Sequence, residues 1–521
     1  MKKAFAWLAL MIITFSTSAQ VTFPEKGISK KDNLHHLIKG ATIHLEPGKT
    51  EVGDILIYKG RITAVGDVTE DAIPANTVIY DRSEKHIYPS FIELNSDYGM
   101  EKTTDKKSKK GPQYERKDNT STYWNEAFHP EVDAFDGFKP NGKDSESLLK
   151  MGFGLALTHH HDGIGRGTSA LVLIGEGEAN EMMLDEKAAQ HFSFSKGSSS
   201  QDYPSSLMGA IALIRQALYD AQWYTTAQQK ETNVSLQALI DQKELPIIFE
   251  ASEANDLIRI QRIAEEFDLK VIVSESGDSY QVLTELGENI TGVISSLDFP
   301  KPFDMSDPEL SRYVSQSDLL HWERAPFNPR YISEVAMPFT LSGNGVEKEK
   351  EFFKNVRMAV EKGLPAEEAL AALTTTPAEF LGTEKVGKLS PGYLANFFIS
   401  DKEIFTEESP KVLEHWIKGK RNIIYEVDAL TFEGNYDLNI DDTYYELSLK
   451  GEEKPKGKVS LIQDKDTLSS KVEFSSQGNE VVLAFDDPEG DGRFRLSATS
   501  LSDNRIWDGR GINPFGQEVL W

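Results

Sequence analysis

The sequence predicts an α/β protein built on a barrel of parallel strands, with β-rich segments on both sides of the barrel. Short apolar runs alternate with amphipathic helical patterns between residues 246 and 373, as in parallel strands joined by crossover helices. Ile- and Val-rich runs separated by turn residues occupy residues 37–88. From residue 430 onward apolar and polar residues alternate, which is typical of an antiparallel sheet with one buried face.

The first 20 residues have the three parts of a secretory signal peptide. Two lysines follow the initial methionine, residues 4–15 are mostly apolar, and the small residues 17–19 provide a cleavage site. The apolar run is too short to cross a membrane. We therefore expect residues 1–19 to be removed and the mature protein to be periplasmic or extracellular, without a membrane span.

The composition is that of a large acidic globular protein. The chain has 521 residues and a formal net charge of −27, so its general electrostatic field disfavours binding to nucleic acid. It has no cysteine, which excludes disulfides and thiolate metal sites. A chain of this length is expected to form more than one domain.

The elements follow from local patterns. The predicted strands before residue 100 are Ala41–Leu45, Asp54–Tyr58, Arg61–Val65, Thr77–Tyr80 and Phe91–Leu94. The later strands are Phe153–Thr158, Ser169–Ile174, Pro246–Phe249, Lys270–Val273, Ile290–Ile294 and Phe339–Leu341. The predicted helices are Ser145–Met151, Ser205–Gln229, Asn255–Phe267, Ser279–Leu286, Lys348–Lys362 and Pro365–Leu373. This succession over about 290 residues predicts a (β/α)8 TIM-like barrel, which typically needs about 250.

Two junctions carry a resemblance to a known family. Residues 88–97 read YPSFIELNSD and resemble the "PG-F-I-D-x-H-x-H" strand that opens the barrel of the metal-dependent amidohydrolase superfamily. Residues 386–397 read VGKLSPGYLANF and are similar to the segment with which amidohydrolases re-enter their β-sandwich. Residues 53–66, GDILIYKGRITAVG, resemble the first half of that sandwich.

The resemblance covers roughly residues 37–425 and implies a domain organisation. Residues 24–88 and 385–425 would form a composite β-sandwich around a barrel of residues 89–384. Residues 430–521 would form a separate C-terminal all-β domain. The family also implies a metal at the C-terminal mouth of the barrel, which activates water to attack a C–N or similar bond.

The family's metal-ligand positions carry other residue types here. Asn95 and Asp97 stand where the first strand has two histidines. Glu250 and Glu275 take the places of two further histidines, and Asn344 replaces the aspartate that serves as ligand and base. Zinc favours imidazole nitrogen, and a neutral asparagine can serve neither as a strong ligand nor as a base. We expect the usual hydrolytic site to be lost.

Two rebuilt metal sites stay open as alternatives. Asp97, Glu250 and Glu275 could form a hard-oxygen site, or they could lie apart and bind nothing. His159 and His161 share one face of a predicted strand end and could bind zinc or manganese together with one of these carboxylates. A histidine run at a surface loop is the competing interpretation.

Arg166, flanked by Gly165 and Gly167, could hold a substrate carboxylate, or the glycines could simply serve a turn. Two classes of function follow. The first is a non-catalytic protein that binds a small-molecule ligand or an active amidohydrolase relative. The second is a hydrolase of amide, cyclic amide or dipeptide-like C–N bonds with a rebuilt metal site.

Overall fold

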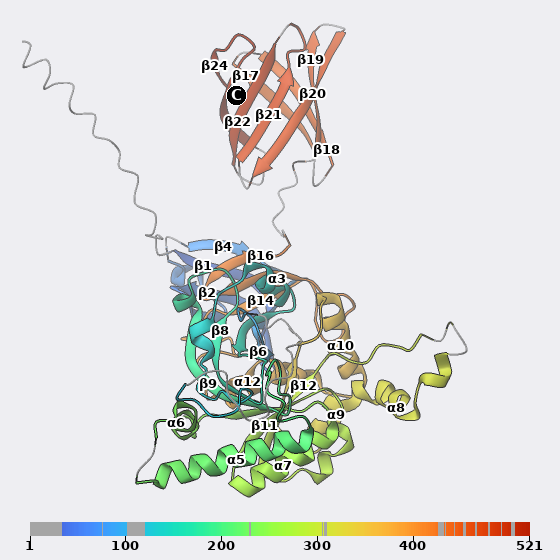
Figure 1. Ribbon diagram of the computed structural model, residues 1–521. Coiled ribbons are helices and arrows are strands. Elements are labelled where there is room, and N and C mark those ends of the chain that lie inside the picture. The colour runs from blue at the N-terminus through green and yellow to red at the C-terminus, as the bar shows by residue number, and fades with distance from the viewer. Residues whose placement is uncertain are drawn as a thin grey trace, which may run out of the picture. The chain divides into compact units, whose positions relative to one another are not determined.

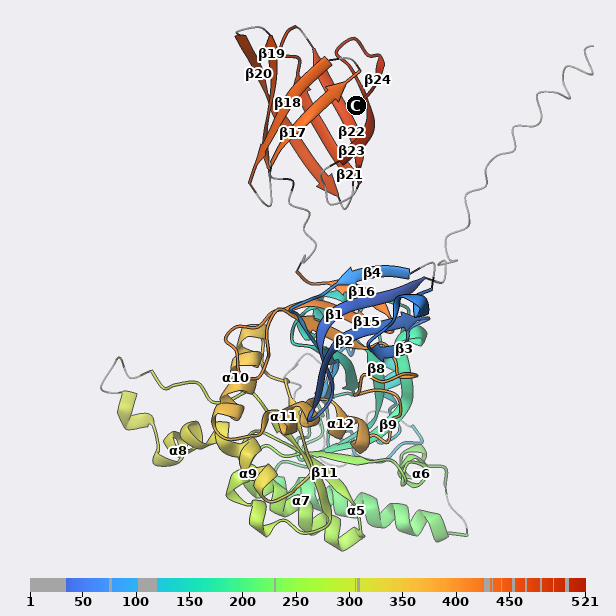
Figure 2. The same cartoon turned by 180° about the vertical axis from the view of Figure 1, so that it is seen from behind.

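The computed structural model describes residues 34–74, 77–101, 120–228, 231–304, 306, 310–425 and 432–521, the last with gaps at 433, 442, 452–454, 464–465, 478–479, 491 and 502–505 (Figures 1 and 2). The expected signal peptide lies outside these residues. The chain divides into two compact units, one up to Ile424 and one from Tyr425 to Trp521. None of the described helices is both long and apolar enough to cross a membrane.

The first sheet combines strands from two distant parts of the chain. Its early members are β1 (His35–Glu46), β2 (Lys49–Tyr58), β3 (Arg61–Gly66), β4 (Thr77–Asp81) and β5 (His86–Pro89). Its late members are β14 (Phe397–Ser400), β15 (Val412–Ile417) and β16 (Lys420–Ile423). Strand β5 pairs with both β1 and β14, so it joins the two groups. The fully buried Trp416 packs with Ile38, Ile43 and Phe397 in the core of this sheet.

The second sheet forms the barrel region. In sequence order its strands are β6 (Phe91–Ser96), β7 (Phe153–Thr158), β8 (Gly165–Leu173), β9 (Met183–Ser193), β10 (Ile247–Glu250), β11 (Val271–Glu275), β12 (Ile290–Ser296) and β13 (Phe339–Ser342). Each strand pairs with the next along the chain. The outer strands β6 and β13 also lie close together. The sheet therefore curls round an apolar interior.

Strand β8 departs from the expected regular alternation. It pairs antiparallel with both β7 and β9, whereas the other pairs of this sheet are parallel. Gly165 and Gly167 lie within the strand, so the interpretation of these glycines as a simple turn is wrong. A Cβ at Gly167 would lie 1.8 Å from the carbonyl oxygen of Val132, and its φ is +79°. Glycine is therefore required for this close approach.

Helices pack around the curled sheet, both in the connections between its strands and after its last strand. They are α2 (Ala134–Gly137), α3 (Gly142–Lys150), α4 (Ala179–Met182), α5 (Leu207–Thr226), α6 (Val234–Asp241), α7 (Ala254–Phe267), α8 (Gln316–Arg324), α9 (Asn328–Glu334), α10 (Glu349–Glu361), α11 (Ala366–Leu373) and α12 (Thr375–Phe380). Helix α7 buries Leu257, Ile260 and Ile263 at helical spacing. Figures 1 and 2 show α5 and α7 side by side next to β11.

The helix expected over Ser279–Leu286 is wrong. The structure has two short 3₁₀ turns there, Ser279–Gln281 and Leu283–Glu285. The Glu275 carboxylate accepts the backbone N–H of Ser279 at 3.2 Å, and the Asn328 side chain accepts that of Tyr280 at 2.7 Å. Side chains from outside the segment thus bind its backbone donors locally, in place of a continued helix.

The C-terminal unit is one antiparallel sheet in sequence order. Its strands are β17 (Gly434–Ile440), β18 (Thr443–Lys450), β19 (Lys456–Gln463), β20 (Asp466–Gln477), β21 (Glu480–Asp486), β22 (Arg493–Leu501), β23 (Ile506–Ile512) and β24 (Glu518–Leu520). Tyr445, Leu447 and Leu449 are buried on alternate positions of β18. The backbone N–H of Asp441, just after β17, donates to the carbonyl of Leu520 at 3.0 Å, so the two edges of the sheet meet.

Candidate functional site

The candidate residues from the sequence gather at one end of the barrel sheet, which we call the barrel mouth. It consists of the C-terminal ends of the parallel strands together with the start of β8. The residues there are Asn95, Asp97, His159, His161, Arg166, Glu250, Glu275 and Asn344. Because these strands run parallel, their C-terminal ends lie at the same edge of the sheet, as in barrels whose sites lie at the strand ends.

Glu93 joins the first and last strands beneath this mouth. Its carboxylate accepts hydrogen bonds from Ser342 Oγ at 2.6 Å and from the backbone N–H groups of Gly343 and Asn95 at 2.7 and 2.9 Å. The side chain is buried, and this burial raises the pKa of Glu93 to about 7. Glu93 thus closes the gap between β6 and β13 by side-chain hydrogen bonds.

The two asparagines and Asp97 do not form a ligand set. The Nδ2 of Asn95 donates to Ser274 Oγ at 3.2 Å and so reaches from β6 to β11. Asp97 is exposed just beyond the end of β6. Asn344 is also exposed, just after β13. The positions that correspond to ligands on the first and last strands are therefore used for bridging or face solvent.

Glu275 is held by a complete set of hydrogen bonds. Its Oε2 accepts the backbone N–H groups of Gly277, Asp278 and Ser279 at 2.7, 2.9 and 3.2 Å. Its Oε1 accepts from the Nδ2 of Asn328 at 3.0 Å. Burial raises the pKa of Glu275. The carboxylate serves the local backbone, and its lone pairs are already engaged.

Asn328 is a site residue that the sequence does not reveal. It is fully buried at the start of α9. Its Nδ2 also donates to Ser295 Oγ at 3.1 Å, and its Oδ1 accepts from Ser279 Oγ at 3.1 Å. An asparagine before a proline reads as an ordinary turn residue in the sequence, so only the tertiary structure shows that it links β11, β12 and α9.

Arg166 and Glu250 form an ion pair at the mouth. Nη1 of Arg166 lies 2.6 Å from Oε2 of Glu250, and Nε donates to the carbonyl of Gly163 at 3.1 Å. The arginine side chain is 3% exposed and that of Glu250 is 34% exposed. A cation is thus already present where the family resemblance places a histidine ligand.

Three histidines stack beside this ion pair. The ring of His159 lies 4.2 Å from that of His161 and 3.7 Å from that of His191, with interplanar angles of 27° and 16°. Burial lowers the pKa values of all three imidazoles, and the nearby Arg166 lowers them further. His159 Nδ1, His161 Nε2 and His191 Nε2 are buried without a hydrogen-bond partner in the described residues. The stack is therefore held neutral.

His191 was missed by the sequence analysis because β9 was missed. In the strand Met183–Ser193 three exposed charged residues follow the first two positions, and only its second half is buried. A segment with neither regular alternation nor a clear apolar run gives a weak strand signal. The HxH spacing of His159 and His161 does place their rings together, but the third ring arrives through long-range pairing of β9 with β8 and β10.

These residues do not fit the metal that the family resemblance implies. Asp97, His159, His161, Glu250 and Glu275 do not assemble into a metal site: within the part of the chain that the structure describes, no three His, Asp or Glu side chains are placed to hold an ion. Stacked imidazoles present their nitrogens in roughly parallel planes, so they do not converge on one point. The two glutamates are engaged with Arg166 and with backbone N–H groups.

An open cavity lies at the rim of the mouth. Its volume is about 430 Å³, and it adjoins the ends of β11, β12 and β13 through Ser276, Asp298 and Gly345. His321, Glu347 and Lys301 complete much of its polar wall. The cavity has room for a small molecule beside Ser276 and Gly345, which follow Glu275 and Asn344 in the chain.

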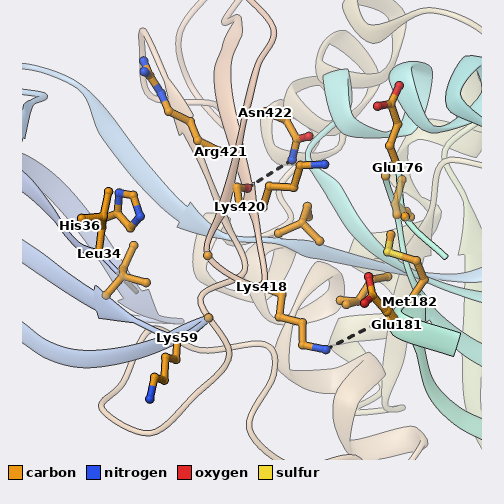
Figure 3. A pocket seen from close by; sticks show the side chains of 18 of the residues that line it. Leu34, His36, Lys59, Glu176, Glu181, Met182, Lys418, Lys420, Arg421 and Asn422 are labelled. Carbon is orange, nitrogen blue, oxygen red and sulfur yellow. Dashed lines mark hydrogen bonds between the residues drawn. The ribbon is translucent and has the colours of Figure 1, made fainter. Parts of the chain in front are cut away.

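A larger cavity of about 820 Å³ lies at the opposite end of β8 (Figure 3). It separates the β15–β16 turn from the residues that follow β8. Lys418 Nζ reaches across to the carbonyl of Glu181 at 3.4 Å. Both basic and acidic side chains line it, among them Lys59, Lys420 and Glu176. None of the candidate residues of the mouth contributes to its walls.

Comparison with known proteins agrees with this architecture. Residues 334–444 match the family model described as the Amidohydrolase family. The structure is similar to that of an amidohydrolase from Thermotoga maritima MSB8, with 21% identity and a TM-score of 0.58 over 74% of this chain and 99% of that chain. The amidohydrolase resemblance is confirmed. At this identity the structural likeness shows the amidohydrolase fold, with its TIM-barrel-type domain.

Two further structures show weaker likeness. A beta-aspartyl dipeptidase from Fervidobacterium islandicum AW-1 has 15% identity and a TM-score of 0.46 over 77% of this chain and 100% of that chain. A putative prolidase from Bifidobacterium longum has 15% identity and a TM-score of 0.45 over 75% and 95% of the two chains. No curated protein matches the chain.

Proposed function

We propose that this chain is an exported, non-catalytic protein with an amidohydrolase fold, which binds a small-molecule ligand at the barrel mouth or supports an active amidohydrolase relative. The observation that carries the proposal is the Arg166–Glu250 ion pair. A buried guanidinium beside the former ligand positions repels a divalent cation. It also occupies the carboxylate that a rebuilt metal site would need.

Arg166 is the residue that we assign to ligand binding. Two of its nitrogens are engaged by Gly163 and Glu250, and its Nη2 makes no hydrogen bond to any other described residue. Guanidinium groups hold carboxylates through charge-assisted hydrogen bonds. A ligand with a carboxylate would therefore approach Arg166 from the mouth.

One observation favours the alternative, a hydrolase of C–N bonds. Three buried imidazole nitrogens without partners, at His159, His161 and His191, are costly to leave unpaired. A rearranged site with His159, His161, Asp97, Glu250 or Glu275 around zinc or manganese would pair some of them. That arrangement requires the Arg166–Glu250 contact to break.

Elemental analysis of the mature protein, combined with hydrolysis assays, tests the proposal. The protein is dialysed against metal-free buffer, then supplied with zinc or manganese and offered a β-aspartyl dipeptide, an N-acyl amino acid and a cyclic amide. We expect no stoichiometric metal and no hydrolysis. Stoichiometric metal that is lost in His161→Ala, with hydrolysis of any of these substrates, would establish the alternative.

Two variants at the ion pair further distinguish the non-catalytic protein from the metal-dependent hydrolase. Glu250→Gln keeps the size of the side chain and removes its charge. Under our proposal it weakens the ion pair and creates no metal binding. If Arg166→Met binds zinc more tightly than the wild-type protein and gains hydrolysis, the arginine blocks a latent metal site, and the non-catalytic assignment applies only to the wild-type chain.

A further inference from the structure

A third pocket lies away from the barrel mouth and is lined by residues of strands β9–β11 and helices α5, α6 and α7. Figure 1 shows where these helices lie beside the sheet. Its volume is about 260 Å³. The walls are almost entirely apolar and include Ile214, Leu218, Ala221, Phe249, Ile260 and Ala264. It belongs to the hydrophobic cluster under these helices, which is distinct from the cluster inside the barrel.

The inner wall of the pocket is closed and its opening is half-exposed. Ile260 and Ala264 on α7 are buried, whereas Leu218 on α5 and Phe267 on α7 are only partly buried. Water inside such a pocket finds few polar partners. An apolar group that enters it is therefore favoured by release from water.

The polar residues of the pocket are few. Gln190 is already hydrogen-bonded to Gln242 at 2.8 Å, while Gln222 and Thr225 are exposed at the opening. Lys243 is the only charged side chain among the described residues that line the pocket. It is 71% exposed and lies 3.6 Å from Glu244, which is 86% exposed, so it remains available to a second anion.

We infer that this pocket binds a medium-chain aliphatic carboxylate, with its chain between α5 and α7 and its head group at Lys243. A methylene group takes up about as much space as a water molecule, roughly 30 Å³, so the pocket has room for about eight to ten carbon atoms. The net charge of −27 disfavours anions in general, but charges farther away than about 8 Å are largely screened at physiological ionic strength. Lys243 at the pocket therefore selects an anionic head group over a cationic one.

Isothermal titration calorimetry with octanoate, decanoate and dodecanoate tests the inference on the full mature chain. Each added CH₂ should tighten the Kd about fourfold until the pocket is full. Decylammonium should bind about two- to fivefold more weakly than decanoate, as expected for a partly exposed charge pair. Lys243→Ala should abolish that head-group preference. The matched surface variant Lys354→Ala, on α10, should leave it unchanged.

A substitution that fills the pocket tests whether decanoate binds there. Ala221→Leu adds volume to the α5 wall and should weaken decanoate binding more than about tenfold, with a melting temperature close to that of the wild type. Arg166→Met should leave decanoate binding unchanged, since this site is separate from the barrel mouth. The inference is overturned if the carboxylates show no saturable binding, if decylammonium binds as well as decanoate, or if a folded Ala221→Leu variant binds decanoate normally. If that variant does not fold, the Lys243→Ala comparison still decides.

Discussion

Arg166 and Glu250 are joined by a 2.6 Å contact between a strand that runs against the barrel direction and one that runs with it. The contact is asymmetric, because the arginine is 3% exposed and the glutamate 34%. Loss of either partner therefore has a different consequence. The arginine would be left as a buried unpaired charge, whereas the glutamate would still reach water.

The first prediction follows from this asymmetry. Glu250→Gln should lower the free energy of unfolding by about 3–5 kcal/mol, the usual result when a buried charge loses its partner. Arg166→Met should cost about 1–2 kcal/mol. Urea unfolding of the two single variants and the double variant measures both effects. Equal losses in the two single variants would contradict the asymmetric burial of the pair.

The second prediction concerns the close approach at β8. Gly167→Ala should lower the free energy of unfolding by more than about 2 kcal/mol, because the new Cβ would meet the Val132 carbonyl and the residue has a positive φ. Gly382 is a matched control, with φ +59° and nothing within 4 Å of its added Cβ. Gly382→Ala should cost only about 1 kcal/mol. A similar loss in both variants would contradict the steric argument.

Glu93 provides a prediction with a defined pH direction. Its pKa is about 7 in the folded protein and about 4.3 in an unfolded chain. Between these values the unfolded chain gives up its proton first, so this group's contribution to stability falls as the pH rises from about 4.3 to 7. The Glu93→Gln variant has no titrating group at this position and therefore lacks this pH-dependent contribution. The free energy of unfolding of the wild type minus that of the variant should therefore be more positive at pH 5 than at pH 8, as measured by urea unfolding at both values.

The histidine stack predicts acid sensitivity. Burial lowers the pKa values of His159 and His191 well below 6.5, so in the folded protein they stay neutral while the unfolded chain takes up protons below about pH 6.5. Stability is lost as the pH falls through this window. His191→Phe keeps a ring in the stack and removes one such group. Its melting temperature should fall less between pH 7.5 and pH 5 than that of the wild type.

An acid response of His191→Phe identical to that of the wild type would show that His191 is protonated in the folded protein. The variant also replaces an unpaired ring nitrogen by an apolar edge. It should therefore be at least as stable as the wild type at pH 5. Each unit of pKa difference corresponds to about 1.4 kcal/mol, which sets the scale of the expected effect.

Local patterns in the sequence were enough for the strands that position the mouth. The apolar run before Asn95 and those that end at Glu250 and Glu275 are short, compact and bounded by polar residues, so their strand character and their common edge could be predicted. The same logic placed His159 and His161 at that edge. These are features in which burial and spacing are visible within a few residues.

The contacts that decide the chemistry could not be predicted in this way. The Arg166–Glu250 pair exists because β8 runs antiparallel between β7 and β9, and strand direction depends on partners distant in the chain. The hydrogen bonds of Asn328 to Glu275 and Ser295 likewise join three elements. Residue types alone indicate what a carboxylate can bind, whereas the fold determines which donor lies within hydrogen-bond distance of it.

The pairing of β5 with β14 has a consequence for how the chain is made. Ile87 and Pro89 pair with Ile399 and Phe397. One edge of β5 therefore has no partner until a segment about 300 residues downstream is made, which takes about 15–60 s at 5–20 residues/s. During that time β5 offers an unpaired edge, which is a template for association between chains. A chaperone that binds the nascent chain, or its rapid export, would protect this edge until residue 400 has been synthesised.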